Sequence, residues 1–166
     1  MENVKEALRN WWQLVKPGGY LVIVVPDEEL YEQGAWPSLF NIDHKATFNL
    51  RKINSWSPVS YDIEALVRAL PGAEVIDARL QDDGYDRRLM RQSTKLGRLL
   101  FRWAIYRQGA FRRLMQVGLP LSRVNLGLDR IERILGKPID QTLGSALAQI
   151  QVVEQKARAD AVPLGT

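Results

Sequence analysis

Residues 20–26 form a continuous run of β-branched and aliphatic side chains, Tyr-Leu-Val-Ile-Val-Val-Pro. The run is far shorter than the roughly 20 apolar residues that cross a bilayer as a helix. It also lacks the alternation with polar residues that marks a strand with one solvated face. Such a run is typical of a strand covered by helices on both faces, as in a parallel sheet. We therefore predict a buried strand here and an α/β fold.

Helices are predicted on both sides of this strand. Apolar residues at helical spacing indicate a helix over 2–16, which Gly18-Gly19 would end. A second helix is expected to begin with Ser60 as its N-cap and to end at Pro71-Gly72. A short helix is also possible at 28–32, within a long segment rich in proline and glycine. Since long loops are often functional, this segment is a candidate site.

Two further strands complete the predicted sheet. Residues 73–81 alternate between apolar and polar, and 146–154 read as a last strand. Between them, 86–137 are expected to form a helical insert, and 157–166 a flexible tail. Helices alternating with strands in this order indicate an α/β fold of three strands with a helical insertion.

Short motifs in these segments resemble a known family. The turn Leu14-Val-Lys-Pro-Gly-Gly19 before a buried strand resembles the turn before the fifth strand of class I S-adenosylmethionine-dependent methyltransferases. One bacterial branch of that superfamily is similar in further motifs over 1–85 and 138–156. These are Pro26-Asp-Glu-Glu-Leu-Tyr-Glu-Gln33, Trp36-Pro-Ser38, Asn41-Ile-Asp-His-Lys45, Ser55-Trp-Ser57 and Asp140-Gln-Thr-Leu-Gly144.

The resemblance implies the carboxy-terminal half of a methyltransferase. It predicts one partial methyltransferase-like domain over 1–156, with a Rossmann-like sheet of three strands. The last strand would lie between the other two and run antiparallel to both. The superfamily holds S-adenosyl-L-methionine with a glycine-rich loop in its first half, and this chain contains no Gly-x-Gly. We therefore expect the chain alone to be an incomplete enzyme.

The candidate site lies in the loop after Pro26, because ligands of open α/β sheets bind beyond the carboxyl ends of the strands. This loop contains the only histidine, His44, and histidine is the side chain best suited to exchange protons near neutral pH. We predict His44 and Asp43 as catalytic residues. The predicted substrate-binding residues are Asp27, Tyr31, Trp36 and Asn41.

Other interpretations of these residues remain open. A lone histidine in a polar loop is more often a structural hydrogen-bonding residue, and adjacent residues in an extended loop tend to point apart, which weakens a direct pair between Asp43 and His44. Trp11 and Trp12 are expected to be core and helix-surface residues rather than ligand contacts, with Trp11 on the apolar face of the helix. The glutamates at 28, 29 and 32 are expected on a solvated turn of helix.

Segment 87–128 holds ten basic residues and no acidic one. On a helical wheel the basic side chains of 87–102 fall within an arc of about 100°, beside an apolar arc. Such a helix can cover the domain's own sheet, lie on an anionic membrane or contact a protein partner. No recognised nucleic-acid-binding module accompanies the charge, so nucleic acid is an unlikely partner. The candidate contact residues are Arg91, Lys95, Arg98, Arg102 and Trp103.

Two functional hypotheses follow. The first is S-adenosylmethionine-dependent methyl transfer to an unidentified acceptor, such as a saccharide or a lipid-linked precursor. The second is a non-catalytic binding or adaptor protein that uses the basic helix. The absence of cysteine excludes disulfides and thiolate metal ligands, and we expect no metal site. We expect a cytoplasmic protein, peripheral to a membrane if the basic helix binds lipid. Self-association or a complementing chain is expected along the edge of strand 20–26.

Overall fold

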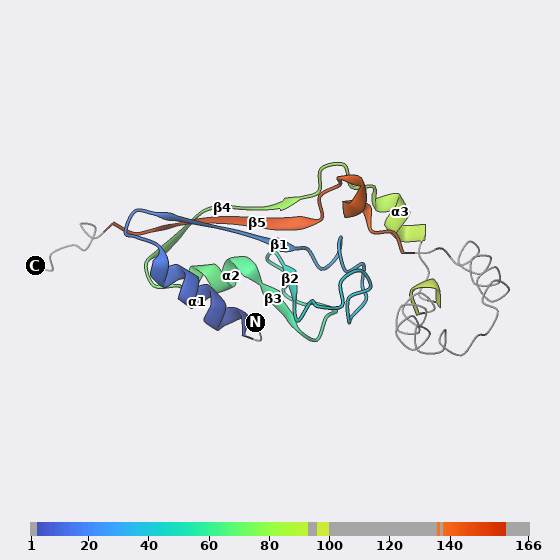
Figure 1. The fold of residues 1–166 in the computed structure, drawn as a ribbon, viewed down its shortest axis with the longest axis horizontal. Coiled ribbons are helices and arrows are strands. Elements are labelled where there is room, and N and C mark those ends of the chain that lie inside the picture. Colours follow the sequence, from blue (N-terminus) through green and yellow to red (C-terminus); the bar gives the residue numbers. More distant parts are fainter. Residues whose placement is uncertain (1–2, 93–95, 100–135, 137, 159–166) are drawn as a thin grey trace, which may run out of the picture.

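The computed structural model describes residues 3–92, 96–99, 136 and 138–158. These residues form a mixed α/β arrangement with one antiparallel sheet of three strands and one parallel pair of short strands (Figure 1). Most of the predicted helical insert and most of the predicted tail lie outside the described residues. The elements are α1 (Val4–Leu14), β1 (Tyr20–Pro26), β2 (Thr47–Asn49), β3 (Ser60–Asp62), α2 (Ile63–Arg68), β4 (Ala73–Gln81), α3 (Arg87–Gln92), the 3₁₀ turn η2 (Gln141–Gly144) and β5 (Gln149–Lys156).

The three-stranded sheet has the order β1-β5-β4, with β5 antiparallel to both neighbours. The predicted position and direction of the last strand are therefore confirmed. Its bounds differ from the predicted 146–154, because Gln155 and Lys156 pair with Tyr20 and Ala73 at the far end of the sheet. Pairing with two neighbours extends the strand into polar residues, which a local apolar pattern does not mark.

Helix α1 begins after Asn3, whose side-chain oxygen accepts hydrogen bonds from the backbone amides of Lys5 and Glu6. Such an N-cap satisfies amides that have no partner within the helix. The first turn of α2 is capped by Asp62, whose side chain accepts from the amide of Ala65. The predicted N-cap at Ser60 was wrong, because Ser60 lies in β3 and its hydroxyl is bonded elsewhere.

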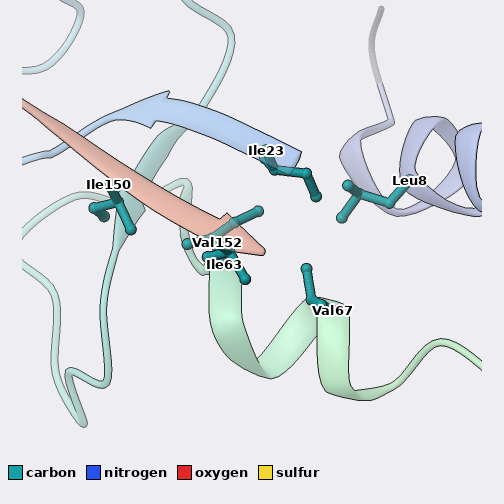
Figure 2. Close-up of a cluster of buried hydrophobic side chains, with 6 residues drawn as sticks. All are labelled: Leu8, Ile23, Ile63, Val67, Ile150 and Val152. Carbon is teal, nitrogen blue, oxygen red and sulfur yellow. The ribbon is translucent and has the colours of Figure 1, made fainter. Parts of the chain in front are cut away.

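The core lies between the sheet and the two helices α1 and α2, which cover the same face of the sheet (Figure 1). Figure 2 shows the buried cluster, in which Leu8 of α1 points toward Ile23 of β1. Burial of each aliphatic side chain of this kind contributes about 1.5–3 kcal/mol. The cluster consists of Leu8, Ile23, Ile63, Val67, Ile150 and Val152.

The opposite face of β1 is exposed. Tyr20, Val22 and Val24 point away from the helices, and Val22 is 56% exposed. The prediction that this strand is covered on both faces is therefore wrong for the described residues, because α1 and α2 both pack on one side. No strand of the described part pairs with the outer edge of β1 before Asp27, which forms a parallel bridge with Phe48.

The segment between β1 and α2 folds beyond the carboxyl end of β1 (Figure 1). It contains β2 and β3, which the sequence analysis missed, and these pair in parallel from Thr47 with Ser60 to Asn49 with Asp62. The predicted short helix at 28–32 is a single turn instead. Within the described ranges, no helix has the length and apolar character required to span a membrane.

Candidate functional site

The turn that follows β1 is held by Asp27. Its Oδ1 atom accepts hydrogen bonds of 3.0 Å from the backbone amides of Glu29 and Leu30. Burial raises the pKa of Asp27, although these two bonds and the charge of Lys52 act in the opposite direction. Asp27, predicted to bind substrate, thus lies buried at the end of the strand and fixes the direction in which the loop leaves the sheet.

Glu28 is fully buried beneath this loop, with an exposed fraction of 0%. Its carboxylate accepts hydrogen bonds from three hydroxyls and one ammonium group: Ser60 at 2.5 Å, Ser55 at 2.8 Å, Lys52 at 3.1 Å and Thr47 at 3.3 Å. Burial alone would raise the pKa of this carboxyl, but the bonds from Ser60, Ser55 and Lys52 hold it below its ordinary value. Glu28 therefore connects residues of the loop that are far apart in the sequence.

The expectation of a solvated acidic cluster was wrong for two of its three members. Glu29 is half-exposed and contacts Lys52 at 2.8 Å, whereas Glu28 and Glu32 are buried. Burial of a carboxylate is favourable only with hydrogen-bond partners. Those partners come from residues 12 to 32 positions further along the chain, so the local sequence pattern did not reveal them.

His44 is paired with Glu32. The Nδ1 atom of His44 lies 2.6 Å from Oε1 of Glu32, and Glu32 is only 1% exposed. The Tyr31 ring packs beside the imidazole, with 5.2 Å between the ring centroids, and also meets Phe40 edge-on at 5.8 Å. The structure thus gives His44 a buried carboxylate and an aromatic neighbour.

Asp43 is exposed, and the carboxylate next to His44 belongs to Glu32. The turn that carries both residues is organised by Asn41, whose side-chain oxygen accepts from the amide of Asp43 at 3.0 Å and whose carbonyl accepts from the amide of His44 at 3.2 Å. Trp36 is half-buried and is followed by a cis peptide bond to Pro37. Asn41 and His44 are thus brought together in one turn, and Asp43 is exposed at this turn.

Sequence reasoning missed Glu32 as a site residue. The signal available was a single histidine in a loop that also contains several carboxylates. That signal indicates an acid–histidine pair, but it does not select among the carboxylates. Only the fold of the loop brings residue 32 to residue 44.

A pocket of about 330 Å³ lies at the carboxyl end of β1. Its lining is largely aliphatic and also includes side chains with hydroxyl and amide groups. Burial raises the pKa of Tyr31, as do the charges of Asp140 and Glu32, so its phenol is protonated at neutral pH and can donate a hydrogen bond. Tyr31 therefore connects the pocket to the His44 ring. The lining residues are Val24, Val25, Pro26, Tyr31, Thr142, Ser145, Ala146, Leu147, Ala148 and Gln149.

The predicted basic surface is described only in part. Arg98 is half-buried and donates a hydrogen bond to the carbonyl of Gln33, beside the candidate site. Arg91 belongs to α3, and its side chain lies outside the description. The remaining candidates, Lys95, Arg102 and Trp103, lie outside the described residues. Among the side chains that are described, no group of three or more His, Asp or Glu is placed to hold a metal ion.

Together, these features define a mixed α/β protein with a buried carboxylate–histidine pair and a pocket at the end of β1. Comparison of the chain with protein-family models, curated proteins and solved structures gave no match.

Proposed function

We propose that this chain supplies the acceptor-side half of a class I S-adenosylmethionine-dependent methyltransferase. The observation that carries the proposal is the strand order β1-β5-β4 with an antiparallel central strand. The resemblance described above implied this order and these directions, and neither follows from the composition of the strands. The loop motifs of the resemblance also lie together at the carboxyl end of β1, where α/β sheets bind ligands.

The residues that the structure describes do not fit the cofactor itself. Among the described residues that line the pocket beside Tyr31, there is no carboxylate that could hold a ribose diol, and the sequence has no Gly-x-Gly turn. In the proposed enzyme, S-adenosyl-L-methionine is held by a complementing chain or segment. Within the part of the chain that the structure describes, the outer edge of β1 has no partner strand, and this edge with the exposed side chains of Tyr20 and Val22 supplies a surface on which that half pairs.

On the acceptor side, His44 and Tyr31 have separate roles. Methyl transfer to a hydroxyl or amine requires alignment of the acceptor and removal of its proton. His44 is the proposed base, and Tyr31, which lines the pocket and contacts the imidazole ring, would position the acceptor. The lining of the pocket includes Thr142 and Ser145, whose hydroxyls donate to neighbouring oxygens of the protein and can accept from a ligand, which suits a polyhydroxylated acceptor such as a saccharide or a lipid-linked saccharide precursor.

Calorimetry tests this proposal in two stages. S-adenosyl-L-methionine titrated into the purified chain alone should give no binding heat. The chain is then isolated with the polypeptide that pairs along β1, and the same titration should give one site per complex. A Val22→Lys variant, which places a charge on the open face of β1, should lose both the complex and the binding. A complex that forms and still fails to bind the cofactor would overturn the proposal.

One observation favours the alternative, a non-catalytic adaptor. Leu96 and Leu99 expose more than half of their surface, while Arg98 between them is tied to the loop at Gln33. Exposed leucines on a basic segment suit a protein or membrane partner. Flotation with vesicles of phosphatidylglycerol, compared with phosphatidylcholine, tests this. Binding that falls in a Leu96→Ser/Leu99→Ser variant, together with no cofactor binding by any complex, would favour the adaptor.

A further inference from the structure

Glu32 has the environment of a residue that controls a neighbouring ring. Its side chain is buried, its Oε1 atom is 2.6 Å from Nδ1 of His44, and its Oε2 atom has no hydrogen-bond partner among the described residues. An ionised carboxylate only accepts hydrogen bonds. With an ionised carboxylate at Glu32, the hydrogen of this contact is on Nδ1 of His44.

A proton fixed on Nδ1 determines what the other ring nitrogen can do. In a neutral imidazole one nitrogen donates and the other accepts, and the hydrogen bond at one nitrogen selects the state of the other. With Nδ1 occupied by Glu32, Nε2 carries the free electron pair. The His44 side chain is 19% exposed, so the ring is held by the protein and still reaches solvent.

The neighbours of the ring support this orientation. Tyr31 packs against the imidazole at 5.2 Å, which limits its rotation, and the backbone amide of His44 is bonded to the carbonyl of Asn41. Asp43, the carboxylate next to His44 in the sequence, is exposed, and its backbone amide donates to the side chain of Asn41. Glu32 is thus the carboxylate that orients His44.

We propose that Glu32 is a positioning residue that holds His44 with its proton on Nδ1 and leaves Nε2 as the proton acceptor for the substrate. The role of Nε2 as a base rests on the proposed function, whereas the protonation pattern of the ring does not. The two claims can therefore fail separately. A structural ion pair alone would stabilise the loop without requiring one ring form.

The single histidine makes this proposal directly measurable. In the ¹⁵N-labelled full chain, long-range ¹H–¹⁵N correlation spectra contain the signals of one imidazole only. In the neutral form of the imidazole, Nδ1 should show the shift of a protonated nitrogen and Nε2 that of an unprotonated one. We expect the Nδ1–H form to exceed the other by about tenfold or more, since charge-assisted hydrogen bonds are the strong ones.

Variants separate positioning from a general effect on folding. Glu32→Ala should lose the preference for Nδ1–H, and Glu32→Gln, which keeps the shape and an amide oxygen, should retain part of it. Asp43→Asn is the matched control and should leave the spectrum unchanged. If Glu32→Ala does not fold, the wild-type spectrum and Glu32→Gln still decide the question.

Two results would overturn the assignment: a wild-type ring protonated on Nε2, or a preference that survives in Glu32→Ala and disappears in Asp43→Asn. A correct ring form in a complex that does not transfer methyl groups would count against the proposed function and leave the role of Glu32 standing. Methyl transfer by a complex whose His44 carries its proton on Nε2 would support the proposed function and overturn the role of Glu32.

Discussion

The hydroxyl of Ser60 donates a hydrogen bond of 2.5 Å to the carboxylate of Glu28, which lies 32 residues earlier in the chain. This bond joins the first residue of β3 to the turn that follows β1. Because Glu28 is fully buried, the loop that carries His44 folds around the carboxylate of this residue. The stability of the site should therefore depend on this carboxylate.

Replacement of Glu28 by Gln should destabilise the protein. The change removes the charge that holds Lys52 and places an amide among hydroxyl donors, so we expect a loss of about 3 kcal/mol in the free energy of unfolding. Urea unfolding at neutral pH measures it. Glu29→Gln is the control, because Glu29 is half-exposed and has a single contact with Lys52; it should cost less than about 1 kcal/mol. Equal losses in the two variants would contradict the role assigned to Glu28.

The two adjacent tryptophans of α1 should respond differently to substitution. Trp12 is buried and its Nε1 atom donates a hydrogen bond of 2.9 Å to the carbonyl of Pro71, whereas Trp11 is 43% exposed. Trp12→Phe removes this bond and leaves a gap, which should cost about 2 kcal/mol. Trp11→Phe should change the stability by less than about 0.5 kcal/mol. Thermal unfolding of both variants tests the difference, and a more harmful change at Trp11 would refute it.

Glu154 should make the protein less stable as the pH rises. Its carboxyl is buried on the helix-covered face of β5, both oxygens lack hydrogen-bond partners within the described part, and burial raises its pKa from 4.5 to about 7. Between these pH values the folded state binds more protons than the unfolded state, so stability falls as the pH increases. The full effect, reached above pH 7, is about 3 kcal/mol.

A comparison of variants isolates this effect. The free energy of unfolding of Glu154→Gln minus that of the wild type should rise by about 3 kcal/mol between pH 4.5 and pH 8. Glu74→Gln, at an exposed position of β4, should show no such trend. A constant difference across this range would show that Glu154 has the same affinity for protons in both states.

The side of the sheet that no described helix covers should cause the chain to associate with itself when no other partner is present. Exposed valines beside an unpaired strand edge are a common cause of association. Sedimentation velocity should show species larger than the monomer at high concentration, and Val24→Lys should reduce them. Ile53→Lys, at a loop position that is 98% exposed, should have no effect. A wild-type chain that stays monomeric at every concentration would contradict the prediction.

The sheet was largely predictable from the sequence. The observed bounds of β1 and β4 are those predicted, 20–26 and 73–81, because dense apolar residues and neighbouring glycines mark them locally. The central position of β5 came from the resemblance, since no local pattern specifies strand order. The exposure of Val22 was not foreseen, because an unbroken apolar run does not reveal that the described helices α1 and α2 pack on the same side of the sheet.

The loop between β1 and α2 was predicted as a candidate site, but its structure was not. Strands β2 and β3 have three residues each, which is too short for an alternating pattern. Glu32 is buried against a partner twelve residues further along the chain. The side chains near Glu32 in the sequence do not indicate this contact. The location of the site was thus predictable, whereas the choice of carboxylate required the fold.

The central place of β5 in the sheet has a consequence for synthesis on the ribosome. Strands β1 and β4 pair with β5 and not with each other. Neither can form these sheet hydrogen bonds until Gln149 and the residues after it have been synthesised. Roughly 120 residues separate the end of β1 from the start of β5, which at 5–20 residues per second means about 6–25 s. During this interval the valines of the nascent β1 are available to chaperones.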